Sequence, residues 1–213
     1  MKENISKIRE LTNKRILKSI LLKNQKSWNL MCGSLDAIES TQMAVDSFSS
    51  FKDDIKDFGL DNLIIYGLFQ ALYVQQDSIS NLCESIGIEF PKFKDAEFEN
   101  KYPELYKVRQ LRNKGIGHPS RDRSNNTHSI INEDDSIQLF SFTENGIFSK
   151  KFYNISDCIE KQNHSLCLLL QQVIEKMISI EQEHKDKYMQ NKFIGCFPED
   201  SQYCIGKIFE AIN

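Results

Sequence analysis

Residues 60–86 have the sequence LDNLIIYGLFQALYVQQDSISNLCESI, and this stretch decides the fold. Its apolar residues recur every three or four positions, which is the spacing of one face of an α-helix. The apolar face is broad, and a helix with such a face usually lies against the core of a helical bundle. Its members are Leu63, Ile64, Gly67, Leu68, Ala71, Leu72, Ile79, Leu82 and Ile86.

A second long helix is predicted directly before this one. Residues 25–58 carry apolar residues, among them Trp28 and Leu35, near a 3.5-residue repeat, and Gly59 is placed to end the helix. Two long helices joined by a short link pack most simply as an antiparallel pair. Residues 1–24 predict a charged, amphipathic helical arm, which either packs on the body or reaches to a partner.

A loop and a shorter helix are expected after the long pair. Residues 87–101 are polar and contain turn-forming residues, so they predict a connecting loop. Pro103 suits the first turn of a helix, where its missing N–H costs nothing. That helix is expected to run to about Lys114, where Gly115 and Gly117 can end it.

Residues 124–153 change from helical to strand character. Three short segments, at 128–132, 137–142 and 147–153, predict strands. The Asn-Gly pair at 145–146 favours a tight hairpin between the last two of them. We therefore expect a small β-meander inserted into a helical protein.

The chain returns to helical periodicity after the predicted strands. Residues 154–191 keep one face apolar, and Ser156 is a candidate N-cap. A last short helix is expected at 201–212.

The composition agrees with a single helical core. The 213 residues include only 4 prolines and 9 glycines, and 40% of them are hydrophobic. We expect a mainly α protein, a bundle of long amphipathic helices with a small inserted β-meander. An N-terminal helical arm at 1–24 would precede one helical domain at 25–213, into which the strands at about 124–153 are inserted.

The totals exclude several functional classes. The net charge of −3 and the pI near 5.9 give no global attraction for nucleic acid or membranes. The six cysteines form no C-x-x-C pair and no zinc-binding spacing. No signal peptide opens the chain, and no apolar run approaches the roughly 18 residues that span a bilayer. We expect a cytoplasmic protein that uses no metal or other cofactor and does not bind membranes.

Positive charge is concentrated in residues 107–123. This basic island contains six basic residues and one acid, so it carries +5 while the rest of the chain carries −8, against a total of −3. Such a patch in an acidic protein is typical of a phosphate-binding surface. A solvated helix face followed by a basic loop would have the same composition.

The basic island also holds the residues best suited to chemistry. Arg112, Asn113 and His118 lie within seven residues at the end of a predicted helix. Arginine offers a charged planar fork that matches phosphate oxygens, and histidine exchanges a proton near neutral pH. Gly115 and Gly117 allow the backbone to turn sharply and to approach a ligand closely.

Arg112-Asn113, followed by four residues and His118, resembles the signature of HEPN domains. The resemblance implies an all-α bundle and a metal-independent endoribonuclease, often a toxin of a toxin–antitoxin pair or an antiviral defence effector. It further implies that two subunits of a homodimer form the active site together and that RNA is the substrate. An antitoxin or a nucleotidyltransferase is a possible further partner.

The resemblance places Arg112, Asn113 and His118 at the catalytic centre. His118 would act as general base on the RNA 2′-hydroxyl, and Arg112 would stabilise the negative charge that builds on the phosphate. Asn113 would hold the phosphate or the imidazole.

Further RNA contacts are expected from the rest of the basic island. Its other basic residues would clamp the RNA backbone. Tyr106 could stack on a base, although tyrosines at such positions more often lie at the edge of a core. The candidate RNA-binding residues are Lys107, Arg109, Lys114, Arg121, Arg123 and Tyr106.

Two alternatives remain open at this point. Arg121 and Arg123 also precede a histidine, His128, by a suitable spacing, although they run through a Ser/Asn-rich loop. The protein could also be a non-catalytic helical module for dimerisation, RNA binding or partner binding. The geometry of the site separates these hypotheses. If Arg112 and His118 are catalytic, they must lie on one exposed surface, whereas a structural Arg112 would be buried in a salt bridge.

Overall fold

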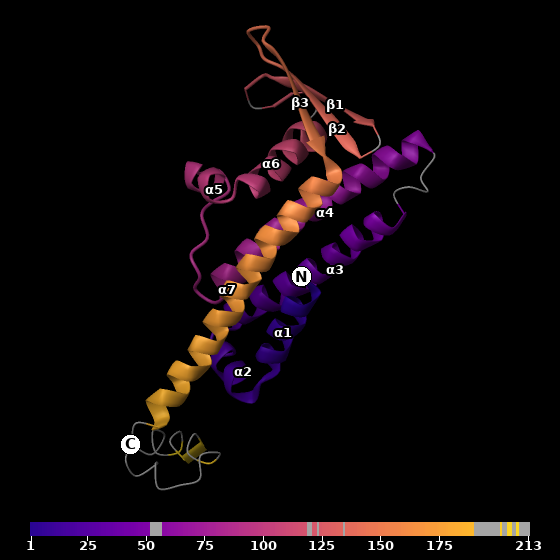
Figure 1. The fold of residues 1–213 in the computed structure, drawn as a ribbon. Coiled ribbons are helices and arrows are strands. Elements are labelled where there is room, and N and C mark those ends of the chain that lie inside the picture. The colour runs from indigo at the N-terminus through magenta and orange to yellow at the C-terminus, as the bar shows by residue number, and fades with distance from the viewer. Residues whose placement is uncertain are drawn as a thin grey trace.

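The computed structural model describes residues 1–51, 57–118, 121–122, 124–133 and 135–189, together with residues 201, 204, 205 and 208. The protein is mainly α-helical, with one three-stranded antiparallel sheet at one end of an elongated helical body (Figure 1). The helices are α1 (Lys2–Asn13), α2 (Arg15–Leu21), α3 (Gln25–Phe51), α4 (Phe58–Ser85), α5 (Ala96–Lys101), α6 (Pro103–Leu111), the π-helical η2 (Arg112–Gly117) and α7 (Ile155–Met189). The strands are β1 (Thr127–Glu133), β2 (Ser136–Phe142) and β3 (Phe148–Asn154).

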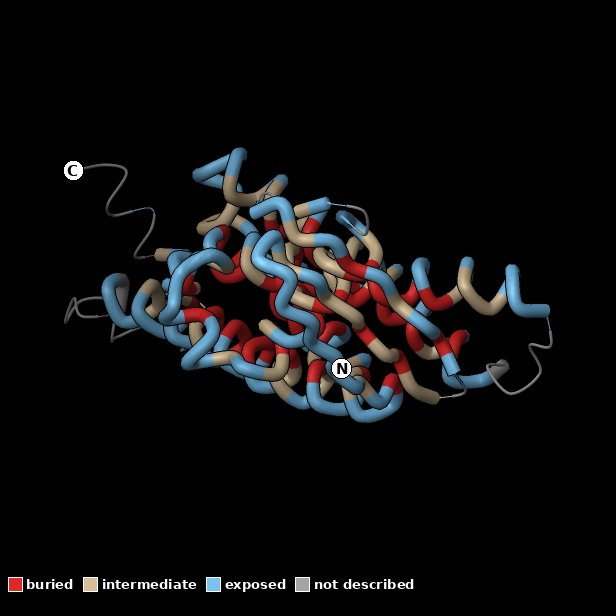
Figure 2. Tube along the Cα trace, turned by 90° about the horizontal axis from the view of Figure 1, so that it is seen from above, coloured by how far each residue is buried: buried red, intermediate tan, exposed pale blue. Residues whose placement is uncertain are grey.

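The predicted fold class is confirmed, and its centre is the antiparallel pair α3 and α4 (Figure 1). The 35-residue helix α7 packs along α4, α6 and α1. Buried residues, red in Figure 2, recur along each of these helices and lie toward the interior of the body. None of the helices in the described part of the chain is long and apolar enough to cross a membrane.

The N-terminal residues belong to the body of the protein. Ile5, Ile8 and Leu11 of α1 and Leu17 of α2 are all buried in the same hydrophobic cluster as residues of α3, α4 and α7. Of the two possibilities for residues 1–24, the structure shows packing on the body.

The boundary between α3 and α4 differs from the prediction. Gly59 does not end the first long helix, because it lies in the first turn of α4, which begins at Phe58. The side chain of Asp57 caps this helix by accepting a hydrogen bond of 2.7 Å from the backbone N–H of Leu60. Residues 52–56 lie outside the described part.

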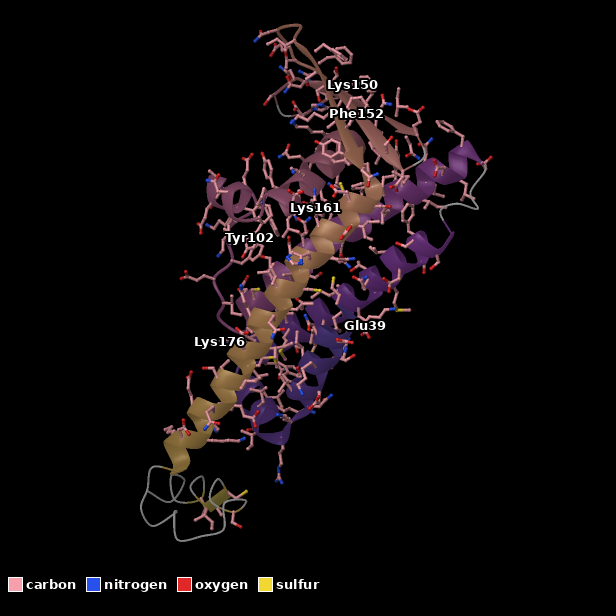
Figure 3. All side chains as sticks on the ribbon, viewed as in Figure 1. Glu39, Tyr102, Lys150, Phe152, Lys161 and Lys176 are labelled. Carbon is pink, nitrogen blue, oxygen red and sulfur yellow. The ribbon has the colours of Figure 1, made fainter. Side chains whose placement is uncertain are left out.

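A short helix, α5, interrupts the segment that was predicted to be a loop. The fully buried Phe98 holds α5 in a cluster of aromatic rings with Phe90, Phe93 and Tyr102 (Figure 3 labels Tyr102). The prediction of an uninterrupted loop at 87–101 was therefore wrong, because buried aromatic contacts stabilise a turn that its polar sequence does not favour.

The N-cap residue of α7 also differs from the prediction. The side chain of Asn154, and not that of Ser156, accepts a hydrogen bond of 2.7 Å from the backbone N–H of Asp157. Asn154 is thus the N-cap, and Ser156 lies in the first turn. The helix predicted at 201–212 falls almost entirely outside the described residues.

The β-meander is confirmed, with strands within one residue of the predicted bounds at each end. Its inner face packs on the helical body through buried Ile137 and Leu139, which share a cluster with α4 and α6. Strand β1 also lies against the π-helical turn η2. The outer face is open to solvent.

Candidate functional site

The site begins where α6 changes its winding. After Leu111 the chain forms the π-helical turn η2, which ends with a hydrogen bond of 2.9 Å from the N–H of His118 to the carbonyl of Asn113, five residues earlier. An α-helix that ends near Lys114 was predicted, and the structure corrects this. Single π-helical turns are rare and are frequent at functional sites.

The two glycines of this turn are needed for close approaches. A Cβ atom added to Gly115 would lie 2.5 Å from Cγ2 of Ile130, so glycine lets β1 pack directly on the turn. A Cβ atom added to Gly117 would lie 2.9 Å from Nη1 of Arg112, so glycine leaves room for the guanidinium. Both distances are shorter than a normal van der Waals contact.

Neutral groups hold the guanidinium of Arg112. Its Nε and Nη2 atoms donate hydrogen bonds of 3.0 and 2.9 Å to Oε1 of Gln70, and Nη1 donates to Oδ1 of Asn113 at 3.2 Å. The guanidinium carbon also lies 4.4 Å from the centre of the Tyr73 ring. No carboxylate in the described part of the chain pairs with Arg112, so its positive charge remains available to an anion.

Arg109, one turn earlier, has the opposite environment. Its Nη1 atom lies 2.8 Å from Oδ1 of Asp77, and the guanidinium is held between the rings of Tyr73 and Phe93, at 3.9 and 3.6 Å from their centres. Arg109 is only 7% exposed. The predicted role of Arg109 as an RNA clamp is not favoured by this geometry, because its charge is paired with Asp77 and its side chain is buried.

His118 lies at the surface, at the C-terminal end of the π-helical turn. Its imidazole has no hydrogen-bond partner among the residues that the structure describes. The turn connects it to Asn113 through the backbone hydrogen bond and to Arg112 through the contact at Gly117. The structure thus brings the three predicted catalytic residues together in one partly exposed turn.

Two further candidates on α6 make local contacts. Lys107 forms an ion pair of 2.8 Å with Glu104, which offsets its charge. Tyr106 is half-buried and packs against the hydrophobic cluster at the N-terminal end of the body. Burial, together with the nearby Glu99 carboxylate, raises the pKa of the Tyr106 hydroxyl. Tyr106 therefore lies at the edge of the core. Another candidate, Lys114, belongs to η2 and is partly exposed.

The loop after His118 carries the remaining basic residues. Arg121 is exposed, and its Nε atom donates a hydrogen bond of 2.8 Å to Oδ1 of Asn125. Its charge meets no carboxylate within the described ranges. Arg123, also a candidate RNA-binding residue, lies outside the described residues.

His128 is a structural residue. Its side chain is 1% exposed, with Nε2 at 3.1 Å from Oδ2 of Asp122 and Nδ1 at 2.9 Å from Oγ of Ser141. The hydrogen bond from His128, and those from Ser124 and Asn126, hold the pKa of the Asp122 carboxyl well below its usual range. His128 itself is buried away from any substrate, and its two hydrogen bonds fix the loop to the sheet.

The burial of His128 therefore argues against the alternative hypothesis, in which Arg121 or Arg123 acts together with His128. A general base must reach the proton that it abstracts, and a buried histidine that already uses both ring nitrogens does not. Among the described residues, Arg112 and His118 are the pair that meets this requirement.

Three positioning residues on α4 were missed by the sequence analysis. Gln70, Tyr73 and Asp77 are spaced at i, i+3 and i+7, so they lie on one face of the helix and meet Arg109 and Arg112 there. The sequence does carry this spacing, as polar or amphipathic residues beside the apolar face. The sequence contains no pattern that predicts the packing of this face against α6.

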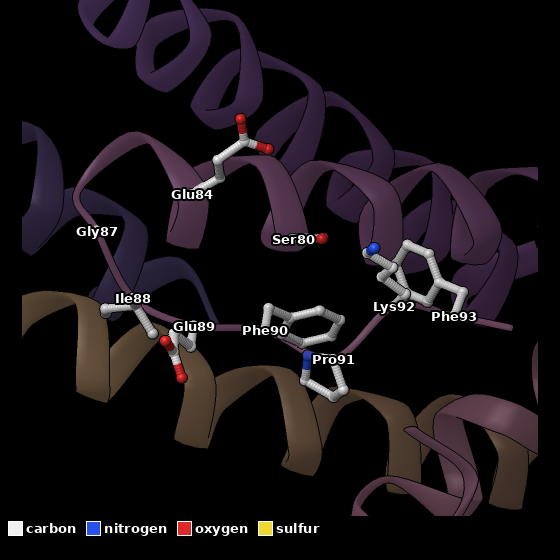
Figure 4. A pocket seen from close by; sticks show the side chains of 9 residues that line it. All are labelled: Ser80, Glu84, Gly87, Ile88, Glu89, Phe90, Pro91, Lys92 and Phe93. Atoms are coloured by element: carbon white, nitrogen blue, oxygen red, sulfur yellow. The ribbon is translucent and has the colours of Figure 1, made fainter. Parts of the chain in front are cut away.

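Other parts of the described surface fit the chemistry less well. A groove between α4 and residues 87–93 is lined by Glu84, Glu89 and Lys92, and it approaches the Arg109 region only through Phe93 (Figure 4). It contains no histidine or arginine. Within the described residues no three His, Cys, Asp or Glu side chains are arranged to hold a metal ion.

Comparison of the chain with protein-family models, with curated proteins and with solved structures gives no match.

Proposed function

We propose that the protein is a metal-independent endoribonuclease whose active site is the π-helical turn from Arg112 to His118. One observation carries the proposal: a guanidinium held entirely by neutral partners lies in the same surface turn as an exposed histidine. A structural arginine would be neutralised, as Arg109 is by Asp77. The resemblance of this segment to HEPN domains supports the same conclusion.

The reaction follows from the chemistry of RNA. His118 removes the proton from the 2′-hydroxyl, and the resulting oxygen attacks the adjacent phosphorus. Arg112 stabilises the negative charge on the non-bridging oxygens, and its fixed position means that little reorganisation is needed. The P–O5′ bond breaks, and the 5′-oxygen takes up a proton from the histidine of a second subunit. The products are a 2′,3′-cyclic phosphate and a 5′-hydroxyl.

Asn113 has a defined part in this scheme. The side-chain oxygen Oδ1 of Asn113 already accepts a hydrogen bond from Arg112, so the side-chain NH₂ group is the part available to a ligand. That group can donate to a phosphate oxygen or to the imidazole of His118. Lys114 and Arg121 have no carboxylate partner in the described part of the chain, and they would hold the RNA backbone nearby.

The alternative is a non-catalytic RNA-binding or partner-binding module with the same surface. The observation that favours it is the imidazole of His118, which no described side chain orients. Catalytic histidines are usually oriented by a second group. In the proposed nuclease this group would come from Asn113, from the substrate or from the second subunit of a homodimer. An antitoxin or nucleotidyltransferase that covers the site would regulate either protein.

The test is cleavage of mixed cellular RNA in excess chelator by the wild type, His118→Ala and His164→Ala. His164 is an exposed histidine on α7 and serves as the matched control. We expect the wild type and His164→Ala to leave cyclic-phosphate ends at equal rates, His118→Ala to be inactive, and single-stranded DNA to stay intact. Equal cleavage by His118→Ala, or loss of cleavage in chelator, would refute the proposal.

A further inference from the structure

The outer face of the sheet carries a cluster of exposed aromatic side chains. The strand register places Phe142 opposite Phe148 and Phe140 opposite Lys150, and Phe152 follows two residues later on the same face of β3. Phe142, Phe148 and Phe152 are 47%, 53% and 66% exposed. These four phenylalanines and Lys150 are called the aromatic face below.

The rings and the lysine form one continuous surface. The ring centres of Phe142 and Phe148 are 5.1 Å apart, and those of Phe140 and Phe148 are 6.1 Å apart in a nearly parallel arrangement. The Nζ atom of Lys150 lies 5.2 Å from the ring centre of Phe140 and 4.5 Å from that of Phe152. A cation therefore lies among the rings. Figure 3 labels Lys150 and Phe152 at the sheet end of the molecule.

This face is unusual for an antiparallel sheet with one buried side. Such strands normally alternate between apolar residues toward the core and polar residues toward water. Here the inner face of β3 carries exposed Ser149 and Lys151, while the outer face carries Phe148 and Phe152. A contiguous exposed apolar patch usually marks a binding surface.

The position of Lys150 distinguishes between classes of partner. Lysine is depleted at the centres of protein–protein interfaces, where its desolvation is costly. Proteins that bind single-stranded nucleic acids instead combine aromatic rings, on which bases stack, with basic side chains that follow the phosphates. Among the described strand residues that point to this face, Glu133 is the acidic one; it lies at the far end of β1 and accepts a hydrogen bond of 3.0 Å from Gln138.

The aromatic face lies at the end of the sheet that follows the proposed active site along the chain. Thr127 pairs with Phe142, which pairs with Phe148, so these rings lie at the end of the sheet that the chain enters from His118. The exposed Arg121 lies in the short connection between them.

We infer that the aromatic face binds single-stranded RNA by stacking bases on Phe142, Phe148 and Phe152, with Lys150 beside the phosphates. This deepens the proposed function, on which it rests for the identity of the substrate, because it restricts the substrate to unpaired RNA. Bases in a duplex are stacked on one another and cannot stack on the rings.

The experiment measures binding without cleavage. The full-length His118→Ala protein is titrated against a fluorescent 12-nucleotide single-stranded RNA and against the same RNA in a duplex, and Kd is read from anisotropy. Phe148→Leu, which keeps an apolar side chain but loses the ring, should weaken single-strand binding about fivefold or more. Phe148→Tyr should stay within about twofold of the parent, because it keeps the ring.

Two further variants complete the design. Lys150→Gln should lower the slope of log K against log salt by about one, as expected for one lost phosphate contact. Leu168→Ala removes a comparably exposed apolar side chain, 55% exposed on α7, and should bind as the parent does. Urea unfolding of each variant checks that the fold is intact.

Several results would overturn the inference. These are equal affinity of Phe148→Leu and Phe148→Tyr, equal affinity for the duplex, or a change in sedimentation of Phe148→Leu with unchanged RNA affinity. The last would make the face a contact between copies of the chain. Ring-dependent binding by a wild type that never cleaves RNA would instead refute only the proposed nuclease, so the two failures are distinguishable.

Discussion

Arg109 and Arg112 are one helical turn apart, and we expect their removal to have opposite effects. Arg109→Ala removes two ring contacts, worth about 0.5–2 kcal/mol each. It also breaks an ion pair worth up to about 1 kcal/mol, since the side chain of Asp77 is 41% exposed. Allowing for non-additivity, the free energy of unfolding should fall by about 2–4 kcal/mol, and Tm by about 5–15 °C.

Arg112→Ala should leave stability nearly unchanged and abolish function. The hydrogen bonds to Gln70 and Asn113 and the contact with the Tyr73 ring that it loses are all partly exposed, so their combined cost should be about 1 kcal/mol. A preorganised group that stabilises transition-state charge is typically worth a factor of about 10² to 10³ in rate. We therefore expect the cleavage rate to fall by that factor while Tm falls by less than about 4 °C.

The assay combines urea unfolding, followed by circular dichroism, with initial cleavage rates of a labelled RNA at 15 °C. The low temperature keeps both variants folded, so that Arg109→Ala can be compared with the wild type on rate alone. Arg109→Ala should retain most of the rate. The reasoning is wrong if Arg109→Ala is stable but inactive, or if Arg112→Ala is active but unfolded.

Two predictions concern the connection between the turn and the sheet. Gly115→Ala should lower the free energy of unfolding by about 1–3 kcal/mol, because the added methyl group would clash with Ile130. In an Ile130→Ala background the same substitution should have little effect. Equal losses in both backgrounds, measured by urea unfolding, would contradict this contact. Asp122→Asn should destabilise the protein by its full amount well above the unfolded carboxyl pKa of about 3.9, and by less as the pH falls toward the folded pKa. The reason is that a carboxyl whose folded pKa is depressed stabilises the fold only while it is ionised. A cost of Asp122→Asn that stays constant between pH 6 and pH 2 would show that the hydrogen bond from His128 does not depress this pKa.

The long helices and the strands could be predicted because their information is local. The apolar spacing in residues 60–86 and the Asn-Gly pair at 145–146 each act within a few residues, and the elements formed as predicted. Cap positions were predicted less well. Asn154 caps α7 in place of the predicted Ser156, and no cap was predicted for α4, which Asp57 caps. Several adjacent polar residues can accept from the same free amides, so the sequence does not single out the cap.

The different environments of the individual basic residues could not be predicted in the same way. Arg109 and Arg112 look equivalent in the sequence, and their difference depends on Asp77 and Gln70, which lie 32 and 42 residues away on α4. His118 and His128 are likewise told apart only by burial. The π-helical winding of η2 has no distinctive composition in the sequence either.

The sheet is physically part of the proposed active site. Ile130 of β1 lies where a side chain at position 115 would be, so the close packing of the strand on the turn requires this glycine. Between His118 and the same strand, the hydrogen bond between buried His128 and Asp122 fixes the connecting loop. A change in the sheet would therefore displace both ends of the segment that carries His118. In the proposed nuclease, the strands inserted directly after this turn would therefore couple RNA bound on the outer face to the reaction at Arg112 and His118.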